Sequence, residues 1–89
     1  MSDIALKSDP QKIVTFKDRW TYGDKAAVLQ LTQQGIPLGI AMLHTVVTGR
    51  NFEDPKDLAD LDDNDGEVVV EAIAKARNEQ LGELGDPNS

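Results

Sequence analysis

Cysteine is absent from the chain, and aromatic residues are scarce. Without cysteine the protein has no disulfide, no thiolate nucleophile and no cysteine-ligated metal centre. One Trp, one Tyr and two Phe are too few for an aromatic platform that stacks bases, and an isoelectric point near 4.4 opposes binding to phosphate backbones. We therefore expect no nucleic-acid partner.

Long apolar runs and a targeting signal are also lacking. The N-terminus does not have the charged and then apolar pattern of a signal peptide, and no run approaches the roughly twenty apolar residues of a membrane span. With 89 residues the chain forms at most one small domain, which buries only about 60–65% of its unfolded surface. We expect a cytoplasmic protein without a membrane partner.

The excess negative charge lies in one segment. Of the sixteen acidic residues, eight lie between Glu53 and Glu67, and together with Lys56 they account for the whole net charge of −7. The rest of the chain is neutral overall. Because this segment leads into an apolar run that starts at Val68, three interpretations are open: a calcium loop, an anionic bait that mimics DNA, or the entrance of a helix.

The calcium interpretation is testable position by position. An EF-hand loop that starts at Asp60 places Asp62, Asn64 and Glu71 where such a loop has ligands. However, the position that needs glycine for the sharp turn is Asp65. An anionic inhibitor needs charge spread over a surface, whereas here it is confined to one segment. We favour the helix entrance and expect neither a metal nor a cofactor.

Three segments differ in their patterning. Residues 1–12 have no hydrophobic period and suggest a flexible arm, residues 13–81 have the content of a single small globular domain, and residues 82–89 suggest a flexible tail. The β-prone run at residues 13–16 predicts a strand or hairpin that ends near Trp20.

Two helices are predicted next. Thr21 and Asp24 have the spacing of a capping box at the start of the first helix, and Gly35 is a suitable residue to end it. Pro37 suits the first turn of a second helix that runs to about Thr48 and is apolar almost all round.

A third helix is predicted from Asp65 to Leu81, with Asn64 as its N-cap and Glu67 completing a capping box. Its apolar stripe consists of Val69, Val70, Ile73 and Ala76, and its polar face of Glu71, Lys75, Asn78, Glu79 and Gly82. The predicted fold class is therefore mainly α: a small single domain of about three helices with a short N-terminal strand or hairpin.

Catalytic chemistry is poorly represented. His44 is the only histidine, and within an apolar helix a hydrogen-bonded structural role is favoured over a general base. The segment from Gly35 to Gly39 lacks the lysine and hydroxyl residue of a phosphate-binding loop. We expect no enzymatic activity. For Trp20, we favour a place in the core over a role as a partner anchor.

Several features follow one another in a defined order along residues 9–81. They are Asp9-Pro10, the segment WTYGDKAAVLQ at 20–30, an apolar helix ending in LHTVVTGRNFEDP at 43–55, an L-x-x-L step at 58–61, and a closing helix VVVEAIAKARNEQ at 68–80. This order resembles the small tail assembly chaperones of long-tailed, siphovirus-type bacteriophages.

The resemblance implies a function without catalysis. Such chaperones are made in the infected bacterial host, bind the long helical tape measure protein, keep it soluble and aid assembly of tail tube protein around it. The alternative within the same setting is a structural head–tail connector or minor tail protein. Self-association is left open. No catalytic residue is implied, because the family has no motif-defined active site.

An apolar helical partner requires an apolar surface on the chaperone. We predict that this surface is the outer part of the second helix and the end of the third. The predicted contact residues are Leu38, Met42, Val46, Leu81 and Leu84.

Overall fold

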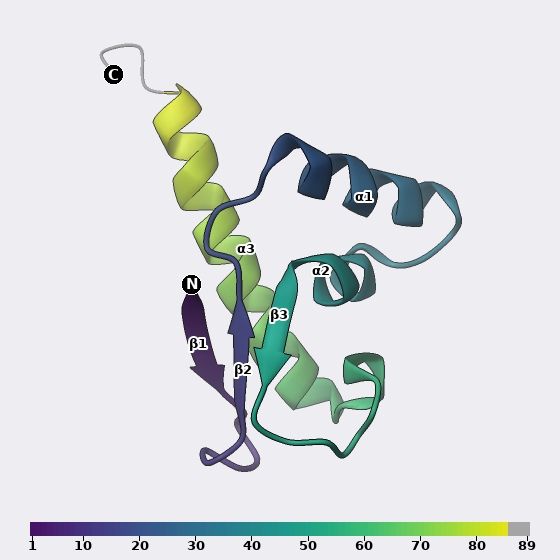
Figure 1. The fold of residues 1–89 in the computed structure, drawn as a ribbon, viewed down its shortest axis with the longest axis vertical. Helices are drawn as coiled ribbons and strands as arrows, with labels where there is room; N and C mark the ends of the chain where they lie inside the picture. Colours follow the sequence, from purple (N-terminus) through teal and green to yellow (C-terminus); the bar gives the residue numbers. More distant parts are fainter. Residues whose placement is uncertain (86–89) are drawn as a thin grey trace.

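The computed structural model describes the backbone of residues 1–85 and the side chains of residues 1–83. Within this part of the chain, three α-helices and a short 3-10 helix accompany a three-stranded antiparallel sheet (Figure 1). In chain order the elements are β1 (Ser2–Ala5), β2 (Ile13–Phe16), α1 (Tyr22–Gln33), α2 (Leu38–Val46), β3 (Val47–Arg50), η1 (Leu58–Asp60) and α3 (Asp63–Gly85). The fold is therefore mixed α/β and not mainly α. The prediction was correct for the three helices and for the strand at residues 13–16, but it did not include β3 or place a strand at residues 2–5.

The sheet has the order β1-β2-β3, so β2 is its central strand. Val14 of β2 pairs with Ile4 on one side and with Arg50 on the other. The helix α3 runs along the back of the sheet, and α1 and α2 lie on the side of the sheet where β3 is (Figure 1). The apolar side chains of β2 thus face the same core as the three helices.

Strand β1 lies in the segment that we expected to be a flexible arm. Its four residues pair with β2, and Leu6, which follows directly, is only 3% exposed. The Leu6 N–H donates to the Lys12 carbonyl at 3.0 Å, which closes the turn between the two strands. The backbone bonds and the burial of Leu6 order this segment, although its own sequence has little periodicity.

Strand β3 replaces the last turn of the predicted second helix. We expected that helix to reach Thr48, but α2 ends at Val46 and the chain continues directly as a strand. The run from Val46 to Thr48 is β-branched, and such residues favour extended backbone over helix. In addition, the Val46 carbonyl accepts a bond from the Lys17 N–H at 3.0 Å.

Helix α1 begins and ends as its sequence predicted. The Thr21 hydroxyl accepts from the Asp24 N–H, and the Asp24 carboxylate accepts from the Thr21 N–H, which completes the capping box. Gly35 has a φ of +92°, and Ile36 donates its N–H to the Leu31 carbonyl. These are the features of a glycine-terminated helix.

Helix α3 begins two residues earlier than predicted. The Asp62 carboxylate accepts from the Asn64 N–H, as an N-cap does, so Asn64 is not the cap. The predicted end at Leu81 is also too early, because the helix continues to Gly85. Residues 82–85 of the predicted tail are therefore helical, and residues 86–89 lie outside the described residues.

The core lies between the sheet and the helices. Val69 and Ile73 of α3 are fully buried, as the predicted apolar stripe requires, and Val70 and Ala76 pack against the same cluster. The buried hydrophobic residues are Leu6, Val14, Phe16, Val28, Ala41, Met42, Leu43, Val46, Val69 and Ile73.

Candidate partner-binding groove

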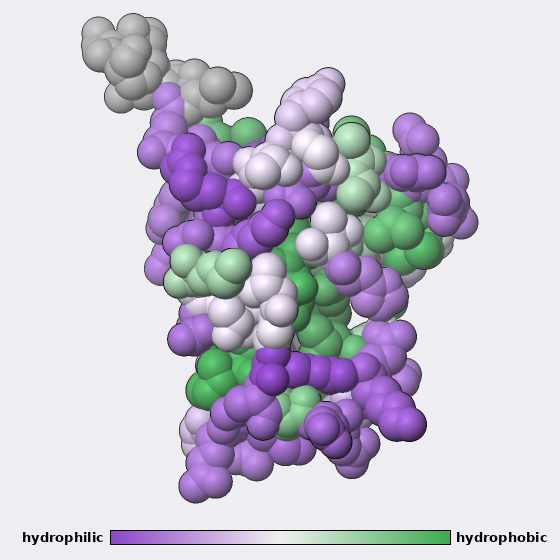
Figure 2. Space-filling model, viewed as in Figure 1, coloured by the Kyte–Doolittle hydropathy of each residue, from purple (hydrophilic) through white to green (hydrophobic). Residues whose placement is uncertain are grey.

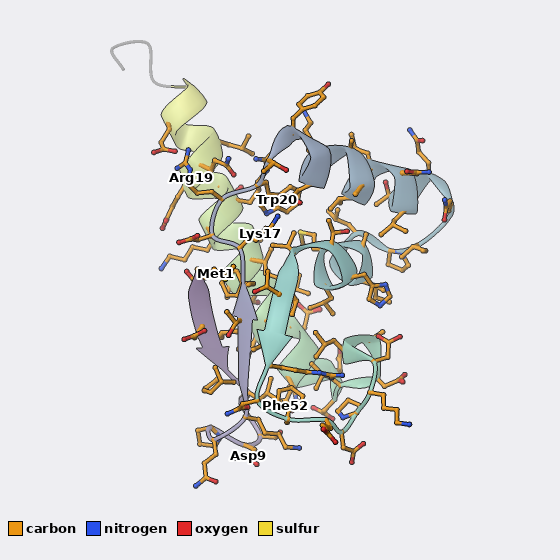
Figure 3. All side chains as sticks on the ribbon, viewed as in Figure 1. Met1, Asp9, Lys17, Arg19, Trp20 and Phe52 are labelled. Carbon is orange, nitrogen blue, oxygen red and sulfur yellow. The ribbon has the colours of Figure 1, made fainter. Side chains whose placement is uncertain are left out.

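Trp20 lies in the connection between β2 and α1, and α3 holds it there. The side chain of Gln80 makes two hydrogen bonds to the Trp20 backbone: its Oε1 accepts from the Trp20 N–H at 2.9 Å, and its Nε2 donates to the Trp20 carbonyl at 2.9 Å. Figure 3 shows the Trp20 side chain between the first turn of α1 and α3. The backbone of Trp20 is therefore held against α3 before any partner binds.

The ring of Trp20 stacks with Arg77. The guanidinium carbon of Arg77 lies 4.6 Å from the ring centroid, and its Nη1 donates to Gln80 Oε1 at 3.0 Å. The indole Nε1 is buried and has no hydrogen-bond partner among the described residues. Trp20 packs against the core, as we favoured, but the same ring also lines a surface hollow.

This hollow, which we call the α1/α3 groove, has a volume of about 490 Å³. Tyr22 and Leu81, which are 85% and 45% exposed, lie on its two sides in α1 and α3. The remaining lining residues are Arg19, Trp20, Thr21, Lys25, Arg77, Gln80 and Glu83. Aromatic, aliphatic and cationic side chains thus share one open concave surface.

The α1/α3 groove is positively charged on an acidic protein. Arg19 pairs with Glu83 at 2.6 Å, whereas Lys25 and Arg77 form no ion pair within the described part of the chain. With three cations and one carboxylate, the local charge is +2, against −7 for the whole chain. Lys25 instead lies over the Tyr22 ring at 5.9 Å, and Arg77 over Trp20.

The first turn of α1 is anchored beside the groove. Asp24 accepts from Thr21 and is also bound by the Lys17 ammonium at 3.1 Å. The backbone hydrogen bond from Thr21 and the contact with Lys17 lower the pKa of the Asp24 carboxyl. The carboxylate therefore stays ionised and holds the start of α1, which carries Tyr22 and Lys25, in a fixed position.

The predicted contact residues do not form one surface. Leu81 lines the α1/α3 groove, and Leu38 is 57% exposed at the start of α2, outside the groove. Met42 and Val46 are only 6% and 0% exposed and lie within the hydrophobic core cluster. They belong to the core and are not part of the proposed surface. The side chain of Leu84 lies outside the described residues.

Most groove residues were not predicted as contacts. Tyr22, Lys25 and Arg77 were not singled out, and Trp20 was weighed as an anchor but assigned to the core. The two halves of the groove come from residues 19–25 and 77–83, so no local pattern joins them. One feature of the sequence could have indicated the groove: Trp, Tyr and a cationic residue lie close together at the start of a capped helix. Trp and Tyr are residue types typical of binding hot spots.

The acidic segment forms a helix entrance, as we favoured. Asp57 accepts from the Ala59 N–H in η1, and Asp62 caps α3. Because the chain is already helical from Asp63, the candidate ligand positions Asp60 and Glu71 are not joined by an EF-hand loop. In the space-filling view, mostly hydrophilic residues cover the end of the molecule below the sheet, where the β1–β2 turn and the loop after β3 lie (Figure 2).

A second hollow adjoins this acidic segment. It has a volume of about 320 Å³ between α2, η1 and the start of α3. Its floor includes Ile40 and Leu61, and its rim carries the exposed carboxylates of Asp62, Asp63 and Glu67. This hollow therefore has the opposite charge to the α1/α3 groove.

His44 is hydrogen-bonded to Asp57. Its Nε2 lies 3.1 Å from Asp57 Oδ1, and the imidazole is 42% exposed. The Ala59 N–H and His44 lower the pKa of the Asp57 carboxyl. The pair links α2 to η1.

No protein-family description, curated protein or solved structure matches the chain. Among the described residues, no three His, Cys, Asp or Glu side chains gather as metal ligands would. None of the helices described here combines the length and apolar content needed to cross a bilayer. The function is therefore argued from the chain's own surfaces.

Proposed function

We propose that this protein is a non-enzymatic assembly chaperone of the phage-tail type, which binds the tape measure protein and aids assembly of the tail tube. The observation that carries the proposal is the α1/α3 groove. It presents Trp20, Tyr22 and Arg77 together, and these residue types supply most of the binding energy in protein interfaces. We choose the tape measure protein as the partner because residues 9–81 resemble tail assembly chaperones.

The exposed apolar side chains support a protein partner. Tyr22 is 85% exposed, Leu29 50% and Leu81 45%, and the first two lie seven positions apart on α1, which places them on one helix face. An amphipathic helix docks by such a face when it covers apolar side chains. A bound partner would bury these apolar side chains, which are exposed to water in the isolated domain.

The acidic segment is suited to keeping such a complex soluble. Along α3, Asp63 and Arg77 are separated by about 21 Å, at 1.5 Å of rise per residue. The carboxylates at the start of α3 therefore lie well away from the α1/α3 groove. They remain in water when the groove is occupied, and their charge opposes self-association of the complex.

Coexpression tests this function. The protein is coexpressed with the long helical protein encoded in the same gene cluster, and the soluble yield of that protein is measured with and without the chaperone. We expect the yield to rise several-fold with the wild-type chain and to fall back with Leu81→Glu, because the substitution places a charge in the apolar part of the groove. Leu38→Glu, at an exposed leucine of α2 outside the groove, controls for a general effect of the added charge.

Two results would contradict the proposal. One is a soluble yield that does not change when the wild-type chain is present. The other is stoichiometric retention of the protein in purified particles, detected by mass spectrometry, which would assign it to the structural class of connectors or minor tail proteins.

A further inference from the structure

We infer that the α1/α3 groove binds an acidic segment of the partner protein, with one large apolar side chain of that segment seated against Trp20, Tyr22 and Leu81. This inference deepens the proposed function, since it rests on the groove being a partner site and adds the chemistry of the bound segment.

The charge of the groove favours an acidic occupant. The groove has a local charge of +2 although the protein as a whole carries −7. Neither Lys25 nor Arg77 is neutralised by a carboxylate within the described residues; each lies over an aromatic ring instead. A cation held over an aromatic ring keeps its charge available to a further anion. Carboxylates of a partner segment are the complementary groups.

The groove contains an aromatic anchor that is held in place by α3. Gln80 fixes the Trp20 backbone with two bonds of 2.9 Å, and Arg77 covers one side of the indole. The pocket is thus preorganised, so a bound side chain does not have to order it. Tyr22 and Leu81 stand exposed beside the indole and would be covered by an apolar side chain of the partner.

The α1/α3 groove and the hollow beside the acidic segment have opposite charges. The second hollow, between α2, η1 and α3, also has an apolar floor, but Asp62, Asp63 and Glu67 line it. An acidic segment is repelled there and attracted to the α1/α3 groove, because like charges placed opposite each other cost binding energy. The hollow between α2, η1 and α3 therefore does not compete for this segment.

The chain's single tryptophan makes the test direct. A short synthetic peptide with glutamates flanking one phenylalanine is titrated into the full-length protein while Trp20 fluorescence is recorded. We expect a saturable change in intensity, and affinity that falls steeply when salt is raised, since exposed charge pairs are screened. Two matched peptides, one with lysine for glutamate and one with alanine for phenylalanine, are expected to bind at least about tenfold more weakly.

Lys25→Glu is the most informative variant. A glutamate in the first turns of α1 is favourable near the helix N-terminus, so the fold is retained. We expect the acidic peptide to bind at least about tenfold more weakly to this variant. Lys75→Glu makes the same charge change on the exposed face of α3, outside the groove, and is expected to bind as the wild type does. Circular dichroism melting checks that both variants are folded.

The outcomes separate this inference from the proposed function. Equal binding of the acidic and basic peptides, or unchanged binding by Lys25→Glu, overturns the inference. Coexpression can still raise the soluble yield in that case, and the chaperone function then stands without this groove. If instead the peptide binds as expected and coexpression has no effect, the chaperone proposal fails and the groove assignment stands.

If a peptide copied from residues 53–67 of this chain binds best and the protein's mass rises with concentration, the occupant is a second copy, which also overturns the inference.

Discussion

Asp65 shows how one side chain joins distant parts of the chain. It lies in the first turn of α3 and is 3% exposed, and its carboxylate accepts from the Ser8 N–H at 2.9 Å and from the Ser8 hydroxyl. The hydroxyl bond and then the amide bond of Ser8 lower the pKa of the Asp65 carboxyl below its ordinary value of 3.8. The ionised form is therefore the one that holds the turn after β1 against α3.

From this bond we predict a pH-dependent loss of stability in Asp65→Ala. A carboxyl whose folded-state pKa is lowered stabilises the fold fully above its unfolded pKa, and this contribution is lost as the pH falls through the folded value. The wild type should therefore exceed the variant in free energy of unfolding at neutral pH, and the difference should shrink below about pH 4. Urea unfolding at a series of pH values measures it.

Asp63→Ala is the matched control for Asp65→Ala. It also removes a carboxylate from the first turn of α3, but its side chain is exposed. We expect it to show only the smaller loss that comes from the helix dipole. If the two variants have the same pH profile, the Ser8 contact does not stabilise the fold.

At the scale of elements, the ends of α1 were predictable because capping is local. Thr21 and Asp24 are three positions apart, and Gly35 follows the helix directly. The strands β1 and β3 were not predictable in the same way, since each has four residues and owes its order to pairing with β2. The groove was missed for a related reason: its two sides are far apart in sequence.

The two glycines Gly35 and Gly82 are predicted to respond to alanine with opposite signs. Gly35 has a φ of +92°, where a side chain is strained, so Gly35→Ala should cost about 1–2 kcal/mol. Gly82 lies within α3 with open space around it, so Gly82→Ala should stabilise the protein by about 0.5–1 kcal/mol. Denaturant unfolding of both variants measures this, and a stabilising Gly35→Ala would contradict the assigned helix end.

At the scale of the whole molecule, the N-terminal segment is an integral part of the domain. Leu6 is 3% exposed and belongs to the same core as Ile73 of α3. If residues 1–12 were a flexible arm, as the sequence suggested, substitutions in them would not change the stability of the remaining domain. The structure instead joins residues 2–8 to both the sheet and α3.

We therefore predict that Leu6→Ala destabilises the entire domain. Truncation of a buried leucine costs about 2–5 kcal/mol through lost burial and the cavity left behind. Leu29→Ala, at an exposed position of α1, should change the stability by less than about 0.5 kcal/mol. Amide hydrogen exchange of β2 should become faster only in Leu6→Ala; equal exchange in the two variants would show that the segment is not coupled to the core.

The bonds between the early part of the chain and α3 also set an order of folding. Ser8 and Asp65 are 57 positions apart, Trp20 and Gln80 60, and Arg19 and Glu83 64. Each contact closes a long loop, whose entropy must be lost before the contact contributes. Helix α1 has its own caps and can form early, whereas the sheet has no helix behind it until α3 has been synthesised. Docking of α3 is thus the step that completes both the core and the α1/α3 groove.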